Sequence, residues 1–554
     1  MKPKRLKYFR EQPIDGQALK KLIEAGLIWL RTNQQIVNSL NVFPVPDGDT
    51  GTNMVLTLQS AMNEISESSE SNFGKMAHSV AHGALMGARG NSGVILSQLW
   101  RGFARAVDHQ EILDATAMAH AFAISRDTAY KGVVRPVEGT ILTVSKDIAT
   151  AAEAALETTN DPFEILEKVV QEASLSVERT PDLLPVLKEA GVVDAGGKGL
   201  FFILEGMLRY ANGQPLDSAL TTVQPLAAMN LENAIESIEP GQDYEVVVDF
   251  RPATALDLES FYSHLEELGT SIQVGEGDGI YRMHIHVPTE NLYEPIDYTR
   301  SLGVITKVSI ENLIDQMQTI EAIRGGSRLT LAPVEPGQIA VVAVSPGPGI
   351  SRVFASLGAA AIVDGGQTMN PSTQEIINAF ENLPTDQVII LPNNKNIILA
   401  AKSASELTVK KVAVVPSCTI PQGLAAMLRL APDGYFDKVA QEMIEALSDV
   451  ESGEITTATR SVEIDGVAVR EGQIIVLHNG KLVMAADDLE EACLGLLKIA
   501  HADHFELITI FYGADMSKNE VNHIVDAIRR DYPGQEIEVQ DGGQPHYQFI
   551  IAIE

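Results

Sequence analysis

Apolar residues recur at three- and four-residue spacing across most of the first 211 positions, and this spacing predicts helices. The first apolar stripe covers residues 19–40. Further stripes follow at 53–66, 75–87, 93–108, 111–130, 139–157, 162–179 and 198–211. Residues 1–211 are therefore expected to form a helical domain of about eight helices, joined by glycine-rich connections.

The pattern of apolar residues changes class beyond this helical stretch. Residues 212–242 are mixed and polar, which predicts a linker. Short alternating runs and amphipathic stretches then predict a small α+β domain over residues 243–323, and residues 324–337 form a second linker. From 338 to 554, buried-type strand patterns alternate with helical ones, which is typical of an α/β domain with a parallel sheet. The chain is expected to be multidomain.

One connection within the helical domain, residues 41–54, places two carboxylates in a tight turn. Asp47 and Asp49 lie two positions apart among prolines and glycines, which favour turns. The next apolar stripe follows at once, so Thr50 or Thr52 is expected to cap the following helix. Mg²⁺ would offset the repulsion between the carboxylates, because it binds through one or two carboxylates plus phosphates. The alternative is a solvated, capped turn without a ligand.

Three other connections carry groups that suit an anion. Residues 87–93 would present backbone N–H groups and the Ser92 hydroxyl at the start of a helix. Residues 191–199 form a second glycine-rich turn before a helix, and residues 131–140 offer cations and a hydroxyl before another. Each segment alone is equally compatible with a plain connector. Together on one helical domain, they indicate a phosphate-binding site.

Composition narrows the classes of function. The chain has 554 residues, with 41 basic against 74 acidic side chains, and its net charge of −33 argues against a nucleic-acid or anionic-membrane surface. Its two cysteines, Cys418 and Cys493, cannot build a disulfide framework, which is usual for a reducing compartment. No apolar run approaches the length of a transmembrane segment. A cytoplasmic location is therefore expected.

Two histidines stand out in the predicted α+β domain. Strand alternation places His284 and His286 on the same face of one strand. Two imidazoles in this arrangement could share a zinc ion with a third ligand from a neighbouring strand or helix. The alternative is a polar, solvated strand face.

The residues of the connections resemble a known family. Segments 47–54, 87–93 and 193–197 are similar to the nucleotide-binding domain of dihydroxyacetone kinases. Along nearly its whole length, the chain resembles the catalytic subunit of bacterial fatty acid kinases, which phosphorylates an acyl chain presented by a separate fatty-acid-binding protein. The resemblance implies a barrel of antiparallel helices with ATP at one rim, a C-terminal domain similar to the fatty-acid-binding partners, and a homodimer.

The resemblance also implies roles for individual residues. Asp47 and Asp49 would be catalytic and, with Asn41, would hold the Mg²⁺ ion that bridges the nucleotide phosphates. The other residues implied to bind the nucleotide are Thr50, Thr52, Asn53, Asn91, Ser92, Gly93, Asp194 and Gly196. Some relatives add a cysteine to the histidine pair. In this chain the corresponding neighbourhood holds Glu245, so Glu245, Asp249 or water would complete a zinc site.

These observations predict an ATP- and Mg²⁺-dependent kinase that forms an acyl phosphate on a fatty acid held by a partner protein. A fatty acid carboxylate has a pKa of about 4.3, so it is ionised at neutral pH and needs no general base. The middle and C-terminal domains would engage the partner. Two alternatives are a dihydroxyacetone-type kinase acting on a small alcohol, and a non-catalytic, nucleotide-gated scaffold.

Overall fold

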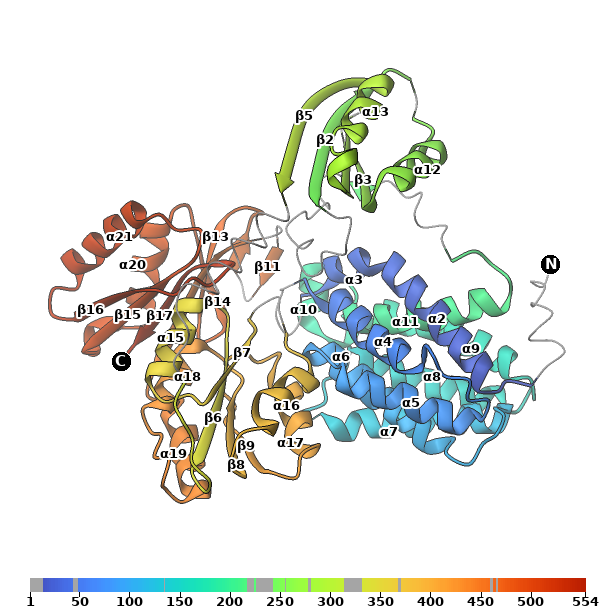
Figure 1. The fold of residues 1–554 in the computed structure, drawn as a ribbon, viewed down its shortest axis with the longest axis horizontal. Coiled ribbons are helices and arrows are strands. Elements are labelled where there is room, and N and C mark those ends of the chain that lie inside the picture. Colours follow the sequence, from blue (N-terminus) through green and yellow to red (C-terminus); the bar gives the residue numbers. More distant parts are fainter. Residues whose placement is uncertain are drawn as a thin grey trace. The chain divides into compact units, whose positions relative to one another are not determined.

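The chain divides into two compact units, Met1–Leu216 with Leu329–Glu554, and Asp217–Arg328 (Figure 1). The structure is a computed structural model that describes residues 13–42, 48–133, 135–216, 224–225, 243–254, 256–277, 280–312, 331–366, 370–458, 462–464 and 467–554. The larger unit combines a helical region with an α/β region, and the smaller unit is α+β. The prediction of a multidomain chain with a helical N-terminal region and a C-terminal α/β domain is confirmed. Most residues of the two predicted linkers lie outside the described ranges.

Helices make up the N-terminal part of the larger unit. They are α2 (Gly16–Thr32), α3 (Gln34–Leu40), α4 (Thr50–Ile65), α5 (Phe73–Met86), α6 (Gly90–Ala106), α7 (Ala115–Gly132), α8 (Ile141–Ala155), α9 (Pro162–Leu183), α10 (Pro185–Ala190) and α11 (Ala195–Ala211). The apolar pattern treated residues 19–40 as one stripe, whereas the structure divides it at Asn33. The short helix α10 was not predicted.

The long helices of this region form a closed ring. Each packs on the next long helix in the chain from α4 to α9, α9 packs on α11, α11 returns to α2, and α2 packs on α4 (Figure 1). The interior is apolar, and a small cavity of about 90 Å³ inside it is lined by side chains such as Phe73, Trp100, Phe122 and Met207. The ring is therefore held together mainly by burial of apolar surface.

Glycines let the last helix of the ring approach the first. A Cβ atom at Gly206 of α11 would lie 2.6 Å from Cβ of Trp29 and 2.7 Å from the backbone oxygen of Ala25, both on α2. The Trp29 indole N–H donates to Glu205 at 2.7 Å, and the Arg209 guanidinium lies 4.0 Å from the Trp29 ring centroid. The ring thus closes on a tightly packed contact between α2 and α11.

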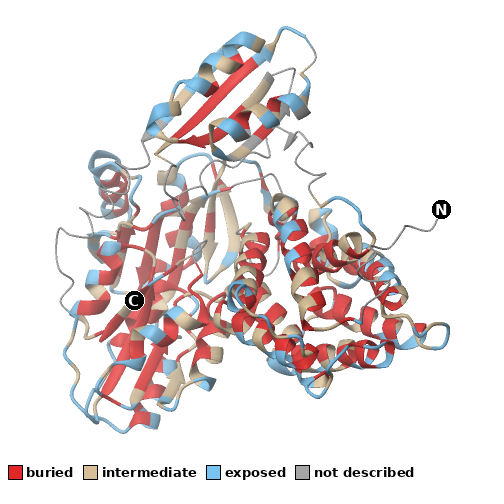
Figure 2. Cartoon of the chain, turned by 45° about the vertical axis from the view of Figure 1, so that its right-hand side comes forward, coloured by how far each residue is buried: buried red, intermediate tan, exposed pale blue. Residues whose placement is uncertain are grey.

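The α/β region begins with a parallel sheet in the strand order β7-β6-β8-β9. Its elements are β6 (Ile339–Ser345), α15 (Pro348–Ser356), β7 (Ala361–Asp364), α16 (Thr373–Glu381), β8 (Gln387–Leu391), α17 (Ile398–Glu406), β9 (Lys411–Val414), α18 (Ile420–Met427) and α19 (Phe436–Ala446). Every residue of β6 is buried, and Figure 2 shows the buried strands between more exposed helices. The parallel sheet predicted from these buried strand patterns is confirmed.

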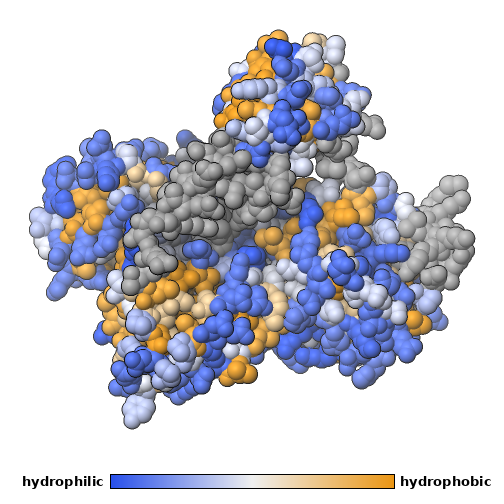
Figure 3. Space-filling view, viewed as in Figure 1, coloured by the Kyte–Doolittle hydropathy of each residue, from blue (hydrophilic) through white to orange (hydrophobic). Residues whose placement is uncertain are grey.

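A second sheet, in the order β14-β13-β10-β17-β15-β16, completes the α/β region. Its elements are β10 (Glu451–Thr457), β13 (Ile474–His478), β14 (Lys481–Ala486), α20 (Leu489–Ile499), η3 (Ala502–His504), β15 (Leu507–Tyr512), α21 (Lys518–Asp531), β16 (Glu536–Asp541) and β17 (Tyr547–Ile553), beside a ribbon of β11 (Val462–Ile464) and β12 (Val467–Val469). Figure 3 shows a mainly hydrophilic surface over α20 and α21, with smaller hydrophobic areas. Across the described residues, no helix is both long and apolar enough to cross a bilayer.

In its described residues, the smaller unit combines a sheet with helices, as the α+β pattern predicted. The sheet runs in the order β1-β3-β4-β2-β5. Its elements are β1 (Gln224–Pro225), β2 (Tyr244–Pro252), α12 (Leu258–Leu268), β3 (Thr270–Gly277), β4 (Ile280–Val287), η2 (Thr289–Asn291), α13 (Glu294–Leu302) and β5 (Gly303–Asn312). A further helix predicted to reach residue 323 lies outside the described residues.

Gly206→Ala should lower the free energy of unfolding of the helical ring by about 1–3 kcal/mol, because the added methyl group would overpack the contact between α2 and α11. Both tryptophans of the chain, Trp29 and Trp100, belong to this ring. Urea unfolding followed by tryptophan fluorescence therefore reports on it selectively. Thr150→Ala, at an exposed position of α8, should change the same free energy by less than about 0.5 kcal/mol. Equal unfolding midpoints for Gly206→Ala and Thr150→Ala would contradict a tightly packed contact between α2 and α11.

Candidate functional site

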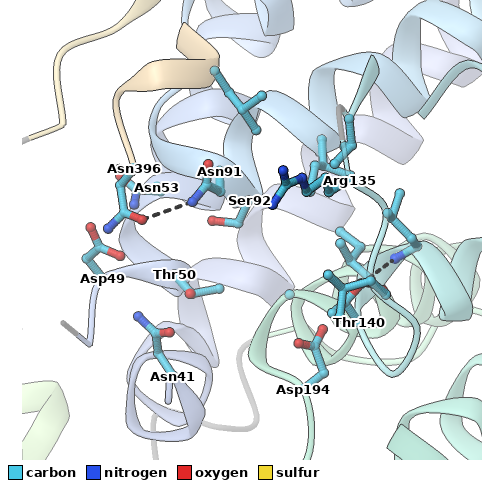
Figure 4. Close-up of a pocket in the computed structure, with 17 residues that line it drawn as sticks. Asn41, Asp49, Thr50, Asn53, Asn91, Ser92, Arg135, Thr140, Asp194 and Asn396 are labelled. Atoms are coloured by element: carbon cyan, nitrogen blue, oxygen red, sulfur yellow. Dashed lines mark hydrogen bonds between the residues drawn. The ribbon is translucent and has the colours of Figure 1, made fainter. Parts of the chain in front are cut away.

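A cavity of about 250 Å³ lies at one rim of the helical ring, against the first loops of the α/β region (Figure 4). Most of its polar lining residues stand at or near the start of a helix. The lining residues are Asn41, Asp49, Thr50, Asn53, Asn91, Ser92, Ile95, Val133, Arg135, Val137, Thr140, Ile141, Leu142, Asp194, Gly196, Asn396 and Leu399. The cavity thus collects polar groups that are far apart in the sequence.

Four helix starts border this cavity. Thr50 opens α4, Asn91 lies in the first turn of α6, and Thr140 and Asp194 are the N-cap residues of α8 and α11. The first backbone N–H groups of a helix lack partners within the helix, and each helix start carries about half a positive charge. The combined field favours a bound anion such as a chain of phosphates.

The carboxylate of Asp49 does not cap α4, because another residue does so. Asp49 occupies the N-cap position, yet its side chain makes no capping hydrogen bond. Instead Oδ1 of Asn38 accepts from the backbone N–H groups of Gly51 at 2.7 Å and Thr52 at 3.1 Å. The prediction that Thr50 or Thr52 caps this helix was therefore wrong, because the capping oxygen comes from the preceding helix.

Thr52 is turned away from the cavity, unlike its neighbours. Its hydroxyl oxygen accepts from Nδ2 of Asn38 at 3.1 Å and from Nε2 of Gln34 at 2.9 Å, and Thr52 is not among the lining residues. Asn41 and Asn53, for which the resemblance implied roles in binding Mg²⁺ and nucleotide, both line the cavity. Asp47, the other predicted catalytic carboxylate, lies outside the described residues.

In the glycine-rich segment 87–93, the helix begins at an earlier residue than the apolar pattern suggested. Helix α6 starts at Gly90, so Asn91 and Ser92 lie in its first turn and line the cavity. Gly93 does not line it. A Cβ atom at Gly93 would lie 2.3 Å from Oγ1 of Thr57, so this glycine allows α6 to pack closely on α4.

Asp194 combines a capping role with burial at the cavity wall. Its Oδ2 atom accepts from the backbone N–H of Gly197 at 2.6 Å. Burial raises the pKa of Asp194 to about 6, against the opposing effect of hydrogen bonds from the backbone of Gly197 and Ile141. Gly196, also predicted, lines the cavity next to it.

A cation that was not assigned from the sequence faces Asp49 across the cavity. Figure 4 shows Arg135 on the side opposite to Asp49. Its loop is anchored through Glu138, which accepts hydrogen bonds from Tyr130 at 3.0 Å, Thr143 at 2.7 Å and Lys146 at 2.7 Å. Burial acts to raise the pKa of Glu138, but these hydrogen bonds hold it below its ordinary value. The basic segment 131–140 was the signal in the sequence that pointed to this cation.

The donor set of the cavity fits a magnesium nucleotide. Carboxylates, amides and hydroxyls from Asp49, Asn41, Thr50 and Ser92 supply hard oxygen ligands, which Mg²⁺ prefers. Neither histidine nor cysteine lines the cavity among the described residues. Arg135 and the helix starts supply the positive charge that phosphate oxygens require.

A separate group of ligands lies in the smaller unit. Glu245, His284 and His286 are buried, and their ligand atoms lie within 4.8 Å of one another. In the antiparallel register of β2 and β4, Glu245 stands opposite His286, and its carboxylate oxygens lie 3.4 Å from Nε2 of His284 and 3.9 Å from Nε2 of His286. The predicted alternative of a solvated strand face was wrong, since the two histidine side chains are 1% and 2% exposed.

These three side chains fit a zinc ion. All four ring nitrogens of His284 and His286 lack hydrogen-bond partners within the described part of the chain. Burial lowers the pKa of His286, so its imidazole is neutral and can donate a lone pair at neutral pH. Asp249, the other carboxylate considered for this site, instead accepts two hydrogen bonds from Arg282, at 2.6 and 2.7 Å.

Comparison with known families defines the class of the chain. Residues 44–209 match the DAK2 domain, residues 239–320 match the middle domain of FakA-like fatty acid kinase subunits, and residues 340–554 match the C-terminal domain of the same proteins. These matches support the classification of the chain as a kinase. The chain belongs to the FakA-like family of fatty acid kinase subunits.

Relatives cover the chain almost completely. An uncharacterized protein of Staphylococcus haemolyticus is 38% identical over 550 residues, which is 98% of this chain and 99% of the relative. Another from Staphylococcus aureus is 36% identical over 548 residues, with the same coverage of 98% and 99%. A solved dihydroxyacetone kinase from C. freundii, in complex with AMP-PNP and Mg²⁺, is 16% identical and overlaps 38% of this chain and 37% of that chain, with a TM-score of 0.29. An overlap this weak carries no argument about function.

Asp194→Asn should change how the stability of the ring depends on pH. A folded-state pKa of about 6, against an ordinary value of 3.8, means that the wild type loses stability as pH rises through this window. Asparagine keeps the capping oxygen but has no proton to lose. Between pH 4 and pH 7, the free energy of unfolding of the variant should therefore gain about 2.4 kcal/mol relative to the wild type.

Urea unfolding followed by tryptophan fluorescence, with EDTA and without nucleotide, measures this difference. Asp114→Asn is the control, because it makes the same exchange at the exposed N-cap residue of α7. A constant difference between Asp194→Asn and the wild type across the pH range would contradict the buried, protonated Asp194.

Metal analysis tests the histidine cluster. We expect the full chain to bind about one zinc ion. Glu245→Gln or His284→Ala should lower the affinity for zinc at least about tenfold, since each variant removes a ligand or its charge. The measurement is competition with a zinc-sensitive chelating dye, supported by elemental analysis of the purified chain. Glu290→Gln changes an exposed carboxylate of the same unit and should bind zinc like the wild type. Equal affinity in all variants would exclude this cluster as the zinc site.

Proposed function

We propose that this chain is the ATP- and Mg²⁺-dependent catalytic subunit of a fatty acid kinase, which transfers phosphate to the carboxylate of a fatty acid held by a separate protein. The observation that carries the proposal is the rim cavity, where four helix starts, Asp49 and Arg135 surround one space. Membership of the FakA-like family of fatty acid kinase subunits supports the acyl substrate.

The side chains of the cavity have distinct tasks in this proposal. Asp49 and Asn41, with Asp47, would hold a magnesium ion, which would neutralise negative charge on the phosphates. The first turn of α6, with Asn91 and Ser92, donates hydrogen bonds to the phosphates. Arg135 stabilises the charge that spreads over the transferred group, in the manner of cations that assist phosphoryl transfer.

The polar lining suits an acceptor that is already ionised. In the described residues no histidine lines the cavity, and the carboxylate of Asp194 is engaged in capping α11. A fatty acid carboxylate, with a pKa of about 4.3, needs no base at neutral pH. Its transfer therefore depends on positioning and charge neutralisation, which these residues provide.

The acyl chain must be brought to the cavity by another protein in this proposal. The family takes its name from one component of a fatty acid kinase, which implies at least one further component. We assign partner recognition to the smaller unit and the α/β region. A homodimer and a cytoplasmic location complete the proposal.

Transfer of labelled phosphate from ATP to oleate tests the function. With Mg²⁺ and a purified fatty-acid-binding protein, the wild type should form a product that hydroxylamine traps as a hydroxamate, because acyl phosphates react with hydroxylamine and phosphate esters do not. Arg135→Ala and Asp49→Ala should lower the rate by about a hundredfold or more. Arg101→Ala, at an exposed position of α6, should retain it.

Two outcomes would contradict the acyl substrate. Turnover of dihydroxyacetone by the isolated chain, without any hydroxamate from oleate, would favour a kinase for small alcohols. Nucleotide binding without transfer to either acceptor would favour the non-catalytic scaffold.

A further inference from the structure

The rim cavity is not built by the helical ring alone. Asn396 and Leu399 line it from the α/β region, which is separated from the ring in the sequence by the whole smaller unit. Asn396 follows β8, and Asn370, which follows β7, contacts Asp49 and Arg89 of the ring. Both strands belong to a parallel sheet, whose carboxyl ends are the usual position of ligand-binding loops. In this chain that edge of the sheet meets the cavity of another domain.

The contacts at this edge fall on residues of the nucleotide site. Nδ2 of Asn370 donates to Oδ2 of Asp49 at 2.6 Å, and Nδ2 of Asn91 donates to Oδ1 of Asn396 at 2.9 Å. Figure 4 shows Asn396 beside Asn91 at the wall of the cavity. The first contact reaches the proposed metal ligand, and the second reaches the helix start proposed to bind phosphate.

The hydrogen bond between Asn370 and Asp49 is buried, the one between Asn91 and Asn396 is partly buried, and further contacts surround them. Asp49, Asn370 and Asn396 are 7%, 2% and 5% exposed. Arg89, the N-cap residue of α6, donates to the backbone oxygen of Asn370 at 3.0 Å and to Glu375 at 3.2 Å. Ala88 and Val94 also belong to the apolar core of the parallel sheet. Arg89 and Asp49 therefore hold Asn370 from the helical ring.

The chemistry of the pair indicates what Asn370 does for Asp49. A carboxylate that binds a metal is commonly held by a hydrogen-bond donor outside the coordination sphere, which fixes its orientation. The amide N–H of Asn370 supplies such a donor, whereas Asp49 makes no capping bond to its own helix. A carboxylate has about four lone pairs, so the hydrogen bond from Asn370 does not by itself prevent Asp49 from binding a cation.

We propose that Asn370 and Asn396, at the carboxyl ends of β7 and β8, are positioning residues of the nucleotide site. Asn370 orients Asp49 for the metal ion, and Asn396 holds Asn91 at the start of α6. The α/β region then completes the kinase site in addition to any part in partner recognition. This inference rests on the proposed binding of Mg²⁺ and ATP to the rim cavity.

Nucleotide affinity of the full chain tests the proposal without requiring the acyl acceptor. A fluorescent ATP analogue is titrated into each variant, once with Mg²⁺ and once with EDTA. Asn370→Ala should weaken binding about 10- to 100-fold with Mg²⁺ and less than about twofold in EDTA, because Asn370 acts through the metal ligand. Asn396→Ala should weaken binding under both conditions, because Asn91 faces the phosphates.

A matched control and a double variant separate positioning from a general role in stability. Asn378→Ala changes an exposed amide of α16 that bonds only within its helix, to Gln374, and should bind like the wild type. Adding Asn370→Ala to Asp49→Asn should cause no further loss with Mg²⁺ if Asn370 acts through Asp49. Asn370→Leu, which keeps the volume without the donor, replaces the alanine variant if the smaller side chain destabilises the chain.

Two results would overturn the inference. The first is that the Asn370 and Asn396 variants bind the ATP analogue with wild-type affinity in the presence of Mg²⁺. The second is that Asn370→Ala lowers this affinity by the same factor in the Asp49→Asn background as in the wild type. Failure of the wild type itself to bind the analogue with Mg²⁺ would instead remove the proposed function on which the inference rests.

Discussion

The closed ring of helices is the constraint on which the site depends. Because long helices that follow one another in the chain also pack side by side, alternate members of the ring begin at the same rim. Helices α4, α6, α8 and α11 are these alternate members, and their first turns surround one cavity. Their partial positive charges add in a space lined by short polar side chains. Closure of the ring by α2 and α11 thus creates the electrostatics of the site as well as the fold.

The sequence predicted the parts of this arrangement that are local. The segments that contain Ser92 and Asp194 were found because glycines mark turns before helix starts within a few positions. The roles of Asn53, Asn91, Ser92 and Asp194 in nucleotide binding were then implied by the resemblance to a kinase family. The helical and α/β regions were predictable as well, since periodicity is a local property.

Contacts between distant parts of the chain were not predictable from one sequence: Asn91 and Asn396 are 305 positions apart. Local patterns also misassigned the cap of α4, whose capping oxygen on Asn38 lies 13 positions before Gly51. Alternation placed both histidines on one strand face, but whether that face is covered depends on tertiary packing.

The two candidate ligand sites differ in the chemistry of their donors. The rim cavity offers oxygen ligands and cations, which suit a magnesium nucleotide. The cluster of Glu245, His284 and His286 offers two imidazoles and one carboxylate, which suit zinc. Because the two sets of ligands prefer different ions, the rim cavity can bind Mg²⁺ and the cluster can bind zinc when both ions are present. The larger unit therefore has the features of a phosphate-handling site, and the smaller unit those of a separate metal centre.

Closure of the ring also has a consequence for biosynthesis. The first helix of the ring ends at Thr32 and its last begins at Ala195, so about 160 residues separate the two partners of the closing contact. At roughly 5–20 residues per second, the apolar face of α2 waits about ten to thirty seconds for α11 to be translated. During that interval the partial ring exposes surface that is buried in the finished domain. A nascent chain of this kind is a natural client for chaperones that bind apolar segments at the ribosome, and synonymous changes that slow translation before residue 195 would lengthen the exposure.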